Sequence, residues 1–543
     1  MFSINYNTKN PLQLFAISHF IEKTGIPFSE NCNKKASLVI NYGKKGEGDF
    51  LINIPKKKES ESLRGNICHN CLKLPLFQPR EENCDSESTI PTEYVSDNEK
   101  SPSISRSGNT INYNYDIFRE VGYLLSGQYE IVHHDEEKLQ NSKIFKTPVA
   151  DHHEELLLKS IITGCEYLNI PLVRKSYWPY DKKFAVCLTH DVDEFKKTYQ
   201  WITKSVRAIK NRNYSAFKNQ IRSLYYKIQG KEPYWTFEEI MELEKKYGVK
   251  STYYFLIESS KRSLFKPENW HLYGRCHSLQ KPCIKKLIKE LNENGHEIGL
   301  HGSTFSYNSP EILKEQKKEI EQISGAKIHG IRQHRLNMNI PATWEHQAEA
   351  GLLYDTSLGY KAAEDPGFRF GTCFPFHPIG TENKPIKILE IPLSVMDVSL
   401  SPGKKGWNQV EEVVNIIEKF NGALTLLWHP PVFNPLEYPL LGEYYKYLIE
   451  MCKEKNAWIA TGYEIASWWK RREEDKISLN KDDKQISIIS SGERNIFLDI
   501  YCPDKNYIKT IKGDAKILSA NKNLSKLRIN ENTEDNKIFL EIL

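Results

Sequence analysis

Several histidine, aspartate and arginine residues directly follow short apolar runs in this sequence. Residues 184–189 (FAVCLT) lead into Asp191 and Asp193, and other apolar runs immediately precede His301 and His429. If these runs are parallel strands, their carboxyl ends meet on one face, where β/α barrels build active sites. A single histidine in such a place is often only a loop residue with local hydrogen bonds. The repeated coincidence favours an active site.

A fourth apolar run, at residues 328–331, leads into Arg332 and His334 in the same way. The spacing of Asp191 and Asp193 places both side chains on one side of a continuing strand. Two carboxylates so placed could share one metal ion or divide the roles of base and ligand. An EF-hand is excluded, because its sixth and twelfth positions would be a lysine and an isoleucine.

The elements that must position these residues alternate regularly between strand and helix. The alternation repeats about seven times between residues 184 and 470, which predicts parallel βαβ units and an α/β fold with a barrel of about seven strands. Helices are expected at the following ranges: 236–248, 282–295, 310–325, 341–351, 411–422 and 443–455.

The length of 543 residues predicts about two to four domains. We expect an N-terminal α/β accessory domain at 1–175, the barrel at 176–472 and a small all-β domain at 476–543. Residues 85–110 contain seven serines and few large apolar residues, which predicts a flexible loop. The basic stretch 196–232 is predicted to be a solvated pair of amphipathic helices inserted after the first barrel strand. A role in gripping an anionic substrate is the alternative.

The charge balance and the apolar patterning exclude several classes of protein. Lys and Arg number 75 against 70 Asp and Glu, so a nucleic-acid-binding protein with a chain-wide basic field is not expected. No apolar run reaches the length of a transmembrane segment, and no secretory signal is recognised at the start. Together with eleven scattered cysteines, this predicts a cytoplasmic protein with reduced thiols. The oligomeric state is left open.

Five motifs occur in the order and spacing of the polysaccharide deacetylase family. They are FAVCLTHDVDEF, NGHEIGLHGSTFSYN, GIRQHRL, LLYDTSLGY with GFRFGTCFPF, and LTLLWHPPVF. The chain most resembles the branch with a THDVD first motif and a separate N-terminal domain, over roughly residues 160–470. The resemblance implies a distorted β/α barrel, a divalent metal that is usually zinc, and removal of acetyl groups from N-acetylated sugars.

The resemblance also assigns catalytic roles to residues of this chain. Asp191 matches the catalytic base, and Arg332 matches the arginine that holds the base. Asp355 matches the acidic residue that supports the arginine, and His429 matches the catalytic acid.

The expected metal ligands follow the family less closely. Asp193 and His301 match the metal carboxylate and the first metal histidine, although the commonest family motif has its two aspartates adjacent. The second metal histidine of the family is replaced here by Phe305, which cannot ligate a metal. Either His334 or His190 closes the site, or water fills the gap, or metal is no longer held tightly. We take Asp193, His301 and His334 as the expected ligands.

The predicted function is a metal-dependent hydrolase that deacetylates an N-acetylated sugar or glycan precursor in surface polysaccharide metabolism, with a carbohydrate as its partner. One rival is a catalytically inactive sugar-binding or scaffold protein on the same barrel, for which Phe305 is the best argument. A second rival is a glycosidase, which needs two carboxyls about 5–9.5 Å apart beside a groove. Asp191 and Asp193 are too close in sequence for that, and Asp355 is the other candidate.

Overall fold

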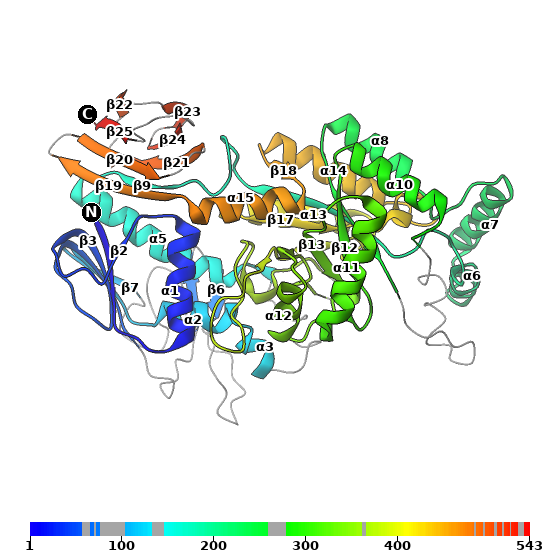
Figure 1. The fold of residues 1–543 in the computed structure, drawn as a ribbon, viewed down its shortest axis with the longest axis horizontal. Helices are drawn as coiled ribbons and strands as arrows, with labels where there is room; N and C mark the ends of the chain where they lie inside the picture. The colour runs from blue at the N-terminus through cyan, green and yellow to red at the C-terminus, as the bar shows by residue number, and fades with distance from the viewer. Residues whose placement is uncertain are drawn as a thin grey trace. The chain divides into compact units, whose positions relative to one another are not determined.

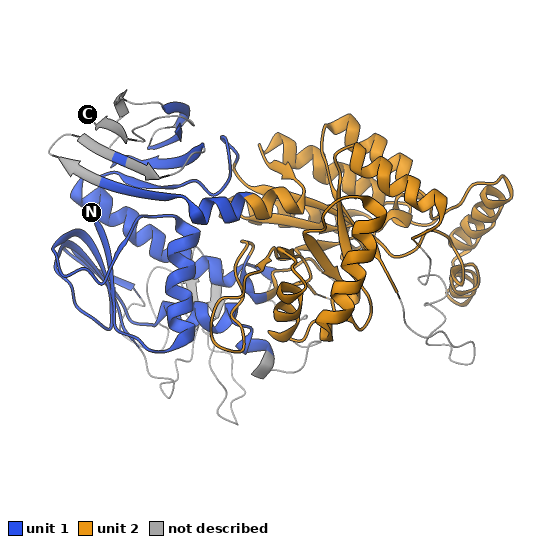
Figure 2. Ribbon diagram, viewed as in Figure 1, with its two compact units in different colours: residues 1–182, 370–372, 468–543 blue, residues 183–369, 373–467 orange. Residues whose placement is uncertain are grey.

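The computed structural model describes residues 1–56, 66–69, 72–75, 104–132, 146–258, 279–360, 365–482, 485–491, 495–503, 508–512, 515–521, 523–529 and 537–542. They form two compact units (Figure 2). Unit 1 contains residues 1–182, 370–372 and 468–543, and unit 2 contains residues 183–369 and 373–467. The division into three domains stays a prediction.

Unit 2 is built on one parallel sheet of nine strands (Figure 1). Its hydrogen-bonded order is β15-β14-β13-β12-β11-β10-β17-β16, and β18 pairs with the start of β10. The strands at the two ends of this order, β15 and β16, are not paired with each other, so the barrel is open. This confirms the predicted distorted β/α barrel. The strands are β10 (Ala185–Val192), β11 (Thr252–Leu256), β12 (Glu297–Gly302), β13 (Gly330–Gln333), β14 (Tyr354–Asp355), β15 (Leu389–Glu390), β16 (Val395–Met396), β17 (Ala423–Leu427) and β18 (Trp458–Ala460).

The helices of unit 2 form where apolar residues recur at helical spacing. In α10, for example, Ile284, Leu287, Ile288 and Leu291 are the buried residues, and a proline occupies the first turn. Among the described residues, no helix is long and apolar enough to span a membrane. The helices are α6 (Gln200–Lys210), α7 (Tyr214–Ile228), α8 (Phe237–Tyr247), α10 (Pro282–Glu293), α11 (Pro310–Ser324), α12 (Ala342–Glu349), α13 (Lys404–Phe420), α14 (Leu441–Glu454) and α15 (Gly462–Glu474), whose last residues belong to unit 1.

The N-terminal part of unit 1 is a six-stranded α/β layer in the order β2-β1-β3-β4-β8-β7. The pairings are parallel except for the antiparallel pair β7–β8. The strands are β1 (Phe2–Tyr6), β2 (Ser29–Glu30), β3 (Ala36–Tyr42), β4 (Gly48–Ile54), β7 (Ile104–Ser107) and β8 (Thr110–Tyr113), with a separate hairpin of β5 (Asn66–His69) and β6 (Leu72–Pro75). The helices are α1 (Pro11–Thr24), α2 (Ile117–Leu125), α3 (Gln128–Val132) and α5 (Val149–Leu168).

The predicted flexible loop at 85–110 is wrong at its C-terminal end. Residues 104–107 form β7, the edge strand of the sheet, and Thr110 begins β8. Ile104 is buried while the next three residues of β7 are exposed, so the serine-rich composition conceals an edge strand. The remaining residues of that prediction, 85–103, lie outside the described residues.

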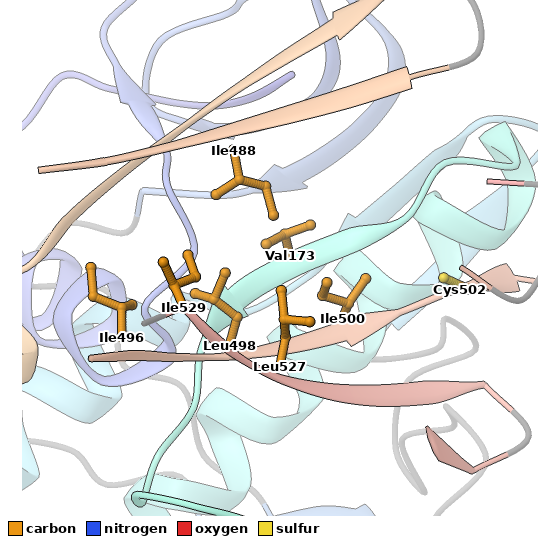
Figure 3. Close-up of a cluster of buried hydrophobic side chains, with 8 residues drawn as sticks. All are labelled: Val173, Ile488, Ile496, Leu498, Ile500, Cys502, Leu527 and Ile529. Carbon is orange, nitrogen blue, oxygen red and sulfur yellow. The ribbon is translucent and has the colours of Figure 1, made fainter. Parts of the chain in front are cut away.

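The C-terminal part of unit 1 consists of two antiparallel four-stranded sheets, which confirms the predicted all-β appendage. One contains β19 (Lys476–Asp482), β20 (Gln485–Ser491), β25 (Lys537–Ile542) and β22 (Ile508–Lys512); the other contains β23 (Ala515–Asn521), β24 (Leu524–Ile529), β21 (Ile496–Tyr501) and β9 (Leu172–Lys175). Aliphatic side chains from both sheets form one buried cluster (Figure 3). It includes Val173 of β9, a strand that precedes the barrel in the sequence.

Candidate active site

The carboxyl end of β10 supplies the predicted base. Asp191 is buried, and Arg332 Nη1 of β13 donates a hydrogen bond to its Oδ1 at 2.9 Å. Arg332 is itself fully buried, and its Nε donates to the carbonyl oxygen of Thr356 at 3.1 Å. Burial favours the neutral guanidine, but the Asp191 carboxylate outweighs burial and raises the pKa of Arg332. A permanent positive charge therefore holds one oxygen of Asp191 in place.

His301 at the end of β12 directs a ring nitrogen toward both aspartates of β10. Its Nδ1 lies 2.8 Å from the carbonyl oxygen of Arg332, and because a carbonyl only accepts, Nδ1 carries the proton. Its Nε2 lies 3.1 Å from Asp193 Oδ1 and 3.6 Å from Asp191 Oδ2. A Cβ at the following residue, Gly302, would lie 2.4 Å from Gln333 Oε1, so a larger residue there would displace the Gln333 side chain.

His334, directly after β13, lies on the other side of Asp193. The hydroxyl of Thr304 donates to Glu258 Oε2 at 2.6 Å, so it accepts from His334 Nδ1 at 3.1 Å. The remaining nitrogen, Nε2, lies 3.6 Å from Asp193 Oδ2. The rings of His301 and His334 are 5.4 Å apart and nearly perpendicular. A hydrogen bond at Nδ1 that orients Nε2 is the usual arrangement of a metal-binding histidine.

These donors suit a divalent cation. The Nε2 atoms of His301 and His334 lie 3.1 and 3.6 Å from the two carboxylate oxygens of Asp193, and imidazole nitrogen and carboxylate oxygen are both ligands of zinc. Tetrahedral zinc bonds of about 2.0–2.2 Å place neighbouring ligand atoms about 3.3–3.6 Å apart. The observed separations of 3.1 and 3.6 Å are close to that range. Within the described part of the chain, however, no group of three or more His, Cys, Asp or Glu residues has an arrangement that could hold a metal ion as it stands.

His190, the other histidine considered for the ligand gap, lies elsewhere. His190 alternates with Asp191 on β10 and points to the opposite face, where its Nδ1 lies 3.0 Å from the Trp428 carbonyl oxygen and its Nε2 lies 3.0 Å from Glu244 Oε1. Phe305 is 63% exposed. The structure therefore brings His334, and not His190, to Asp193.

His429, directly after β17, is paired with an acidic residue that was not predicted. Its backbone N and its Nδ1 lie 2.7 and 2.9 Å from Asp397 Oδ2, and its side chain is 26% exposed. Burial favours the neutral ring, but the Asp397 carboxylate outweighs burial and the pKa of His429 is raised to about 10. The available signal was that Asp397 also follows an apolar run, now seen as β16.

Asp355 lies behind Arg332 in the interior of unit 2. Its Oδ1 accepts hydrogen bonds from the backbone N and the hydroxyl of Ser357, and no hydrogen bond joins it to Arg332. Burial raises the pKa of Asp355, and burial together with the Asp355 charge raises the pKa of Glu390, so this pair holds its proton on Glu390. The role of Asp355 as the support of Arg332 stays a prediction. Because Asp355 is fully buried, it does not face a groove as a glycosidase carboxylate would.

No protein-family model and no curated protein matches this chain. A solved structure from Mycobacterium smegmatis, assigned as a polysaccharide deacetylase, is 19% identical, with 55% of this chain and 94% of that chain covered and a TM-score of 0.36. The structure of Puue allantoinase is 15% identical, with coverages of 55% and 93% and a TM-score of 0.36. A protein from Pseudomonas aeruginosa PAO1, also assigned as a polysaccharide deacetylase, is 15% identical, with coverages of 56% and 97% and a TM-score of 0.35.

The family that the motifs indicate is thus the family named for two of these three structures. At TM-scores of 0.36 and below, the likeness carries no argument about the reaction. The chemistry has to be derived from the side chains of the site.

Proposed function

We propose that this protein is a metal-dependent deacetylase that hydrolyses the acetamide group of an N-acetylated sugar or glycan precursor, in the synthesis or modification of a surface polysaccharide. The observation that carries the proposal is the grouping of a base, a base-holding arginine and three ligand candidates at neighbouring strand ends. Asp191 lies 2.9 Å from Arg332 Nη1 and 3.6 Å from His301 Nε2, while Asp193 lies between His301 and His334.

The side chains of the chain divide the proton transfers between them. Asp191, held by the hydrogen bond from Arg332, accepts a proton from the attacking water. The water oxygen bonds to the acetyl carbon, and the carbon–nitrogen bond then breaks. His429, protonated beside Asp397, donates its proton to the departing amine, which leaves as the free amino sugar while acetate is released.

Asp193, His301 and His334 would hold the metal. When bound, a divalent cation supplies a Lewis acid that stabilises negative charge on the acetyl oxygen. Zinc is the expected ion, since two imidazoles and one carboxylate suit it.

The proposal is tested by acetate release from N-acetylglucosamine oligomers with the zinc-loaded protein. Asp191→Asn should lower kcat by about 10²–10⁴-fold, the usual contribution of a general base, without loss of bound zinc. The matched control is Glu349→Gln, which removes a carboxylate paired with Lys314 on the surface. Activity of Asp191→Asn equal to that of the control would overturn the assignment of the base.

The alternative is a sugar-binding or scaffold protein that has lost activity. The exposed Phe305 at the second ligand position favours it. Metal content after dialysis against zinc separates the two: a stoichiometric ion supports the hydrolase, and less than about 0.1 equivalents supports the inactive protein.

A further inference from the structure

The insertion between β10 and α8 carries an unusual concentration of exposed apolar side chains. It contains α6 and α7, which project from the rest of unit 2 (Figure 1). Of the fifteen exposed large hydrophobic residues among those described, eight belong to this helical hairpin: Ile202, Val206, Ile209, Tyr214, Ile221, Leu224, Tyr225 and Ile228.

The exposed apolar residues form one stripe on each helix. On α6, Ile202, Val206 and Ile209 are spaced at i, i+4 and i+7, and the stripe on α7 has the equivalent spacing. The inward positions are instead small or polar. Ser223 of α7 is fully buried whereas Ile228 is 74% exposed. The hairpin therefore exposes its apolar stripes and buries small or polar residues, whereas an ordinary surface helix pair buries its apolar stripe.

The same hairpin is strongly basic. Residues 196–231 contain ten Lys and Arg residues and no Asp or Glu. Seven of these cations are exposed, and no carboxylate of the described residues lies within ion-pair distance of them: Lys196, Arg207, Lys210, Arg212, Lys218, Arg222 and Lys231. On α6 the cations border the apolar stripe directly, since Ile202, Val206, Arg207 and Lys210 line one shallow hollow of about 480 Å³.

The inner face of the hairpin is anchored near the candidate active site. Lys197 Nζ and Lys204 Nζ lie 2.5 and 2.9 Å from the carboxylate of Glu437, and Ser223 donates to the same group. Glu437 belongs to the segment that follows His429 at the end of β17. The hairpin is thus attached to the carboxyl-end side of the barrel, where β10 and β17 end.

We propose that the α6–α7 hairpin docks onto the surface of a bilayer that contains anionic phospholipids. Isoleucine, leucine and tyrosine side chains would enter the boundary between headgroups and acyl chains, while the flanking arginines and lysines meet lipid phosphates. The positive charge of the hairpin favours an anionic lipid surface over a second copy of the chain. A second copy of the hairpin would place cation against cation, whereas an anionic lipid surface complements the seven exposed cations that have no carboxylate of the described residues beside them. The inference concerns binding and does not depend on the proposed reaction.

The test is co-sedimentation of the full chain with two kinds of vesicle, phosphatidylcholine alone and phosphatidylcholine mixed with phosphatidylglycerol. We expect binding to the mixed vesicles, at least about tenfold stronger than to the neutral ones. Binding should weaken as salt rises from about 0.1 M to 1 M, because the Debye length falls from about 10 to 3 Å.

Variants distinguish insertion of the apolar stripe of α6 into the bilayer from nonspecific binding of the protein to vesicles. The triple change Ile202→Ser, Val206→Ser and Ile209→Ser should weaken binding to the mixed vesicles at least about tenfold. The conservative triple change of the same residues to Leu should retain binding. The matched control Leu353→Ser, at an exposed apolar residue elsewhere in unit 2, should also leave binding unchanged.

Two results would overturn the proposal. One is equal binding of the serine variant and the unmodified chain to mixed vesicles, or no binding by either. The other is a dimer of the unmodified chain in sedimentation velocity that the serine triple dissociates while vesicle binding is absent, which would assign the face to a second copy.

Discussion

The two faces of β10 show two different uses of buried histidine and carboxylate. On one face, Glu244 accepts hydrogen bonds from Tyr445 and Ser251, and His190 Nε2 lies 3.0 Å from its Oε1. Burial opposes ionisation, but the neighbouring His190 outweighs burial and lowers the pKa of Glu244. On the other face, Asp193 lies between the ring nitrogens of two histidines whose other nitrogens carry the protons.

This difference indicates that the residues around Glu244 are structural, whereas those around Asp193 are a candidate metal site. Around Glu244 the surrounding donors satisfy the carboxylate, so the group is complete without a ligand. Around Asp193, the Nε2 atoms of His301 and His334 lie 3.1 and 3.6 Å from the two carboxylate oxygens, and imidazole nitrogen and carboxylate oxygen are groups that bind a divalent cation. The His190 and Asp191 side chains are neighbours in sequence, yet alternation along the strand assigns them to opposite faces.

The largest expected effect on stability comes from removing the Glu244 carboxylate. Glu244→Gln should lower the free energy of unfolding by about 3–5 kcal/mol, because it removes the charge that compensates buried donors. Urea unfolding measures this change. The surface variant Glu411→Gln is the control and should change stability by less than about 0.5 kcal/mol. A loss below about 1 kcal/mol for Glu244→Gln would remove the distinction between the faces.

Asp193→Asn on the other face should act on the metal more than on the fold. We expect the affinity for zinc to fall at least about 100-fold, or about 2.7 kcal/mol, because an anionic ligand becomes a neutral amide. Stability of the metal-free protein should fall less than in Glu244→Gln, since the Asp193 side chain is 12% exposed whereas that of Glu244 is fully buried. Calorimetric titration with zinc and urea unfolding in chelator give the two readings. Unchanged zinc affinity would contradict the ligand assignment.

The smallest effect is expected at the His429–Asp397 pair. Asp397→Asn should return the pKa of His429 from about 10 toward 6.5, as followed by NMR titration of the metal-free protein. Since the pKa in the folded protein lies above the unfolded value, the pair stabilises the fold fully below pH 6.5, and this is lost as pH rises through about 10. The partly exposed ring limits the contribution to about 1.5 kcal/mol. An unaltered His429 titration in the variant would show that another group sets its pKa.

The sequence predicted those parts of the site and fold that depend on local periodicity. The strand alternation places Asp191 and Asp193 on one face, and it could also have excluded His190. Its signal for Asp397 was weak, because β16 has only two residues and the contact of Asp397 with His429 depends on the pairing of β16 with β17. The amphipathic helices were predicted for the same reason. β14, β15 and β16 are too short to show any period.

Long-range pairing was equally beyond local pattern. β9 was placed with the N-terminal residues by its position in the chain, but it pairs with β21 of the C-terminal sheet. β7 was missed because a serine-rich edge strand has one buried residue among exposed ones. In each case the deciding contacts come from residues distant in sequence.

The pairing of β9 with β21 has a consequence for the folding of this chain during its synthesis. Arg174 of β9 and Asp499 of β21 form a 2.9 Å ion pair across 325 positions of sequence. Since β9 precedes the barrel in the chain, it cannot pair with β21 until the C-terminal strands have been synthesised. A chain released after residue 475 would leave Val173 uncovered on an unpaired strand, which makes early termination a route to aggregation.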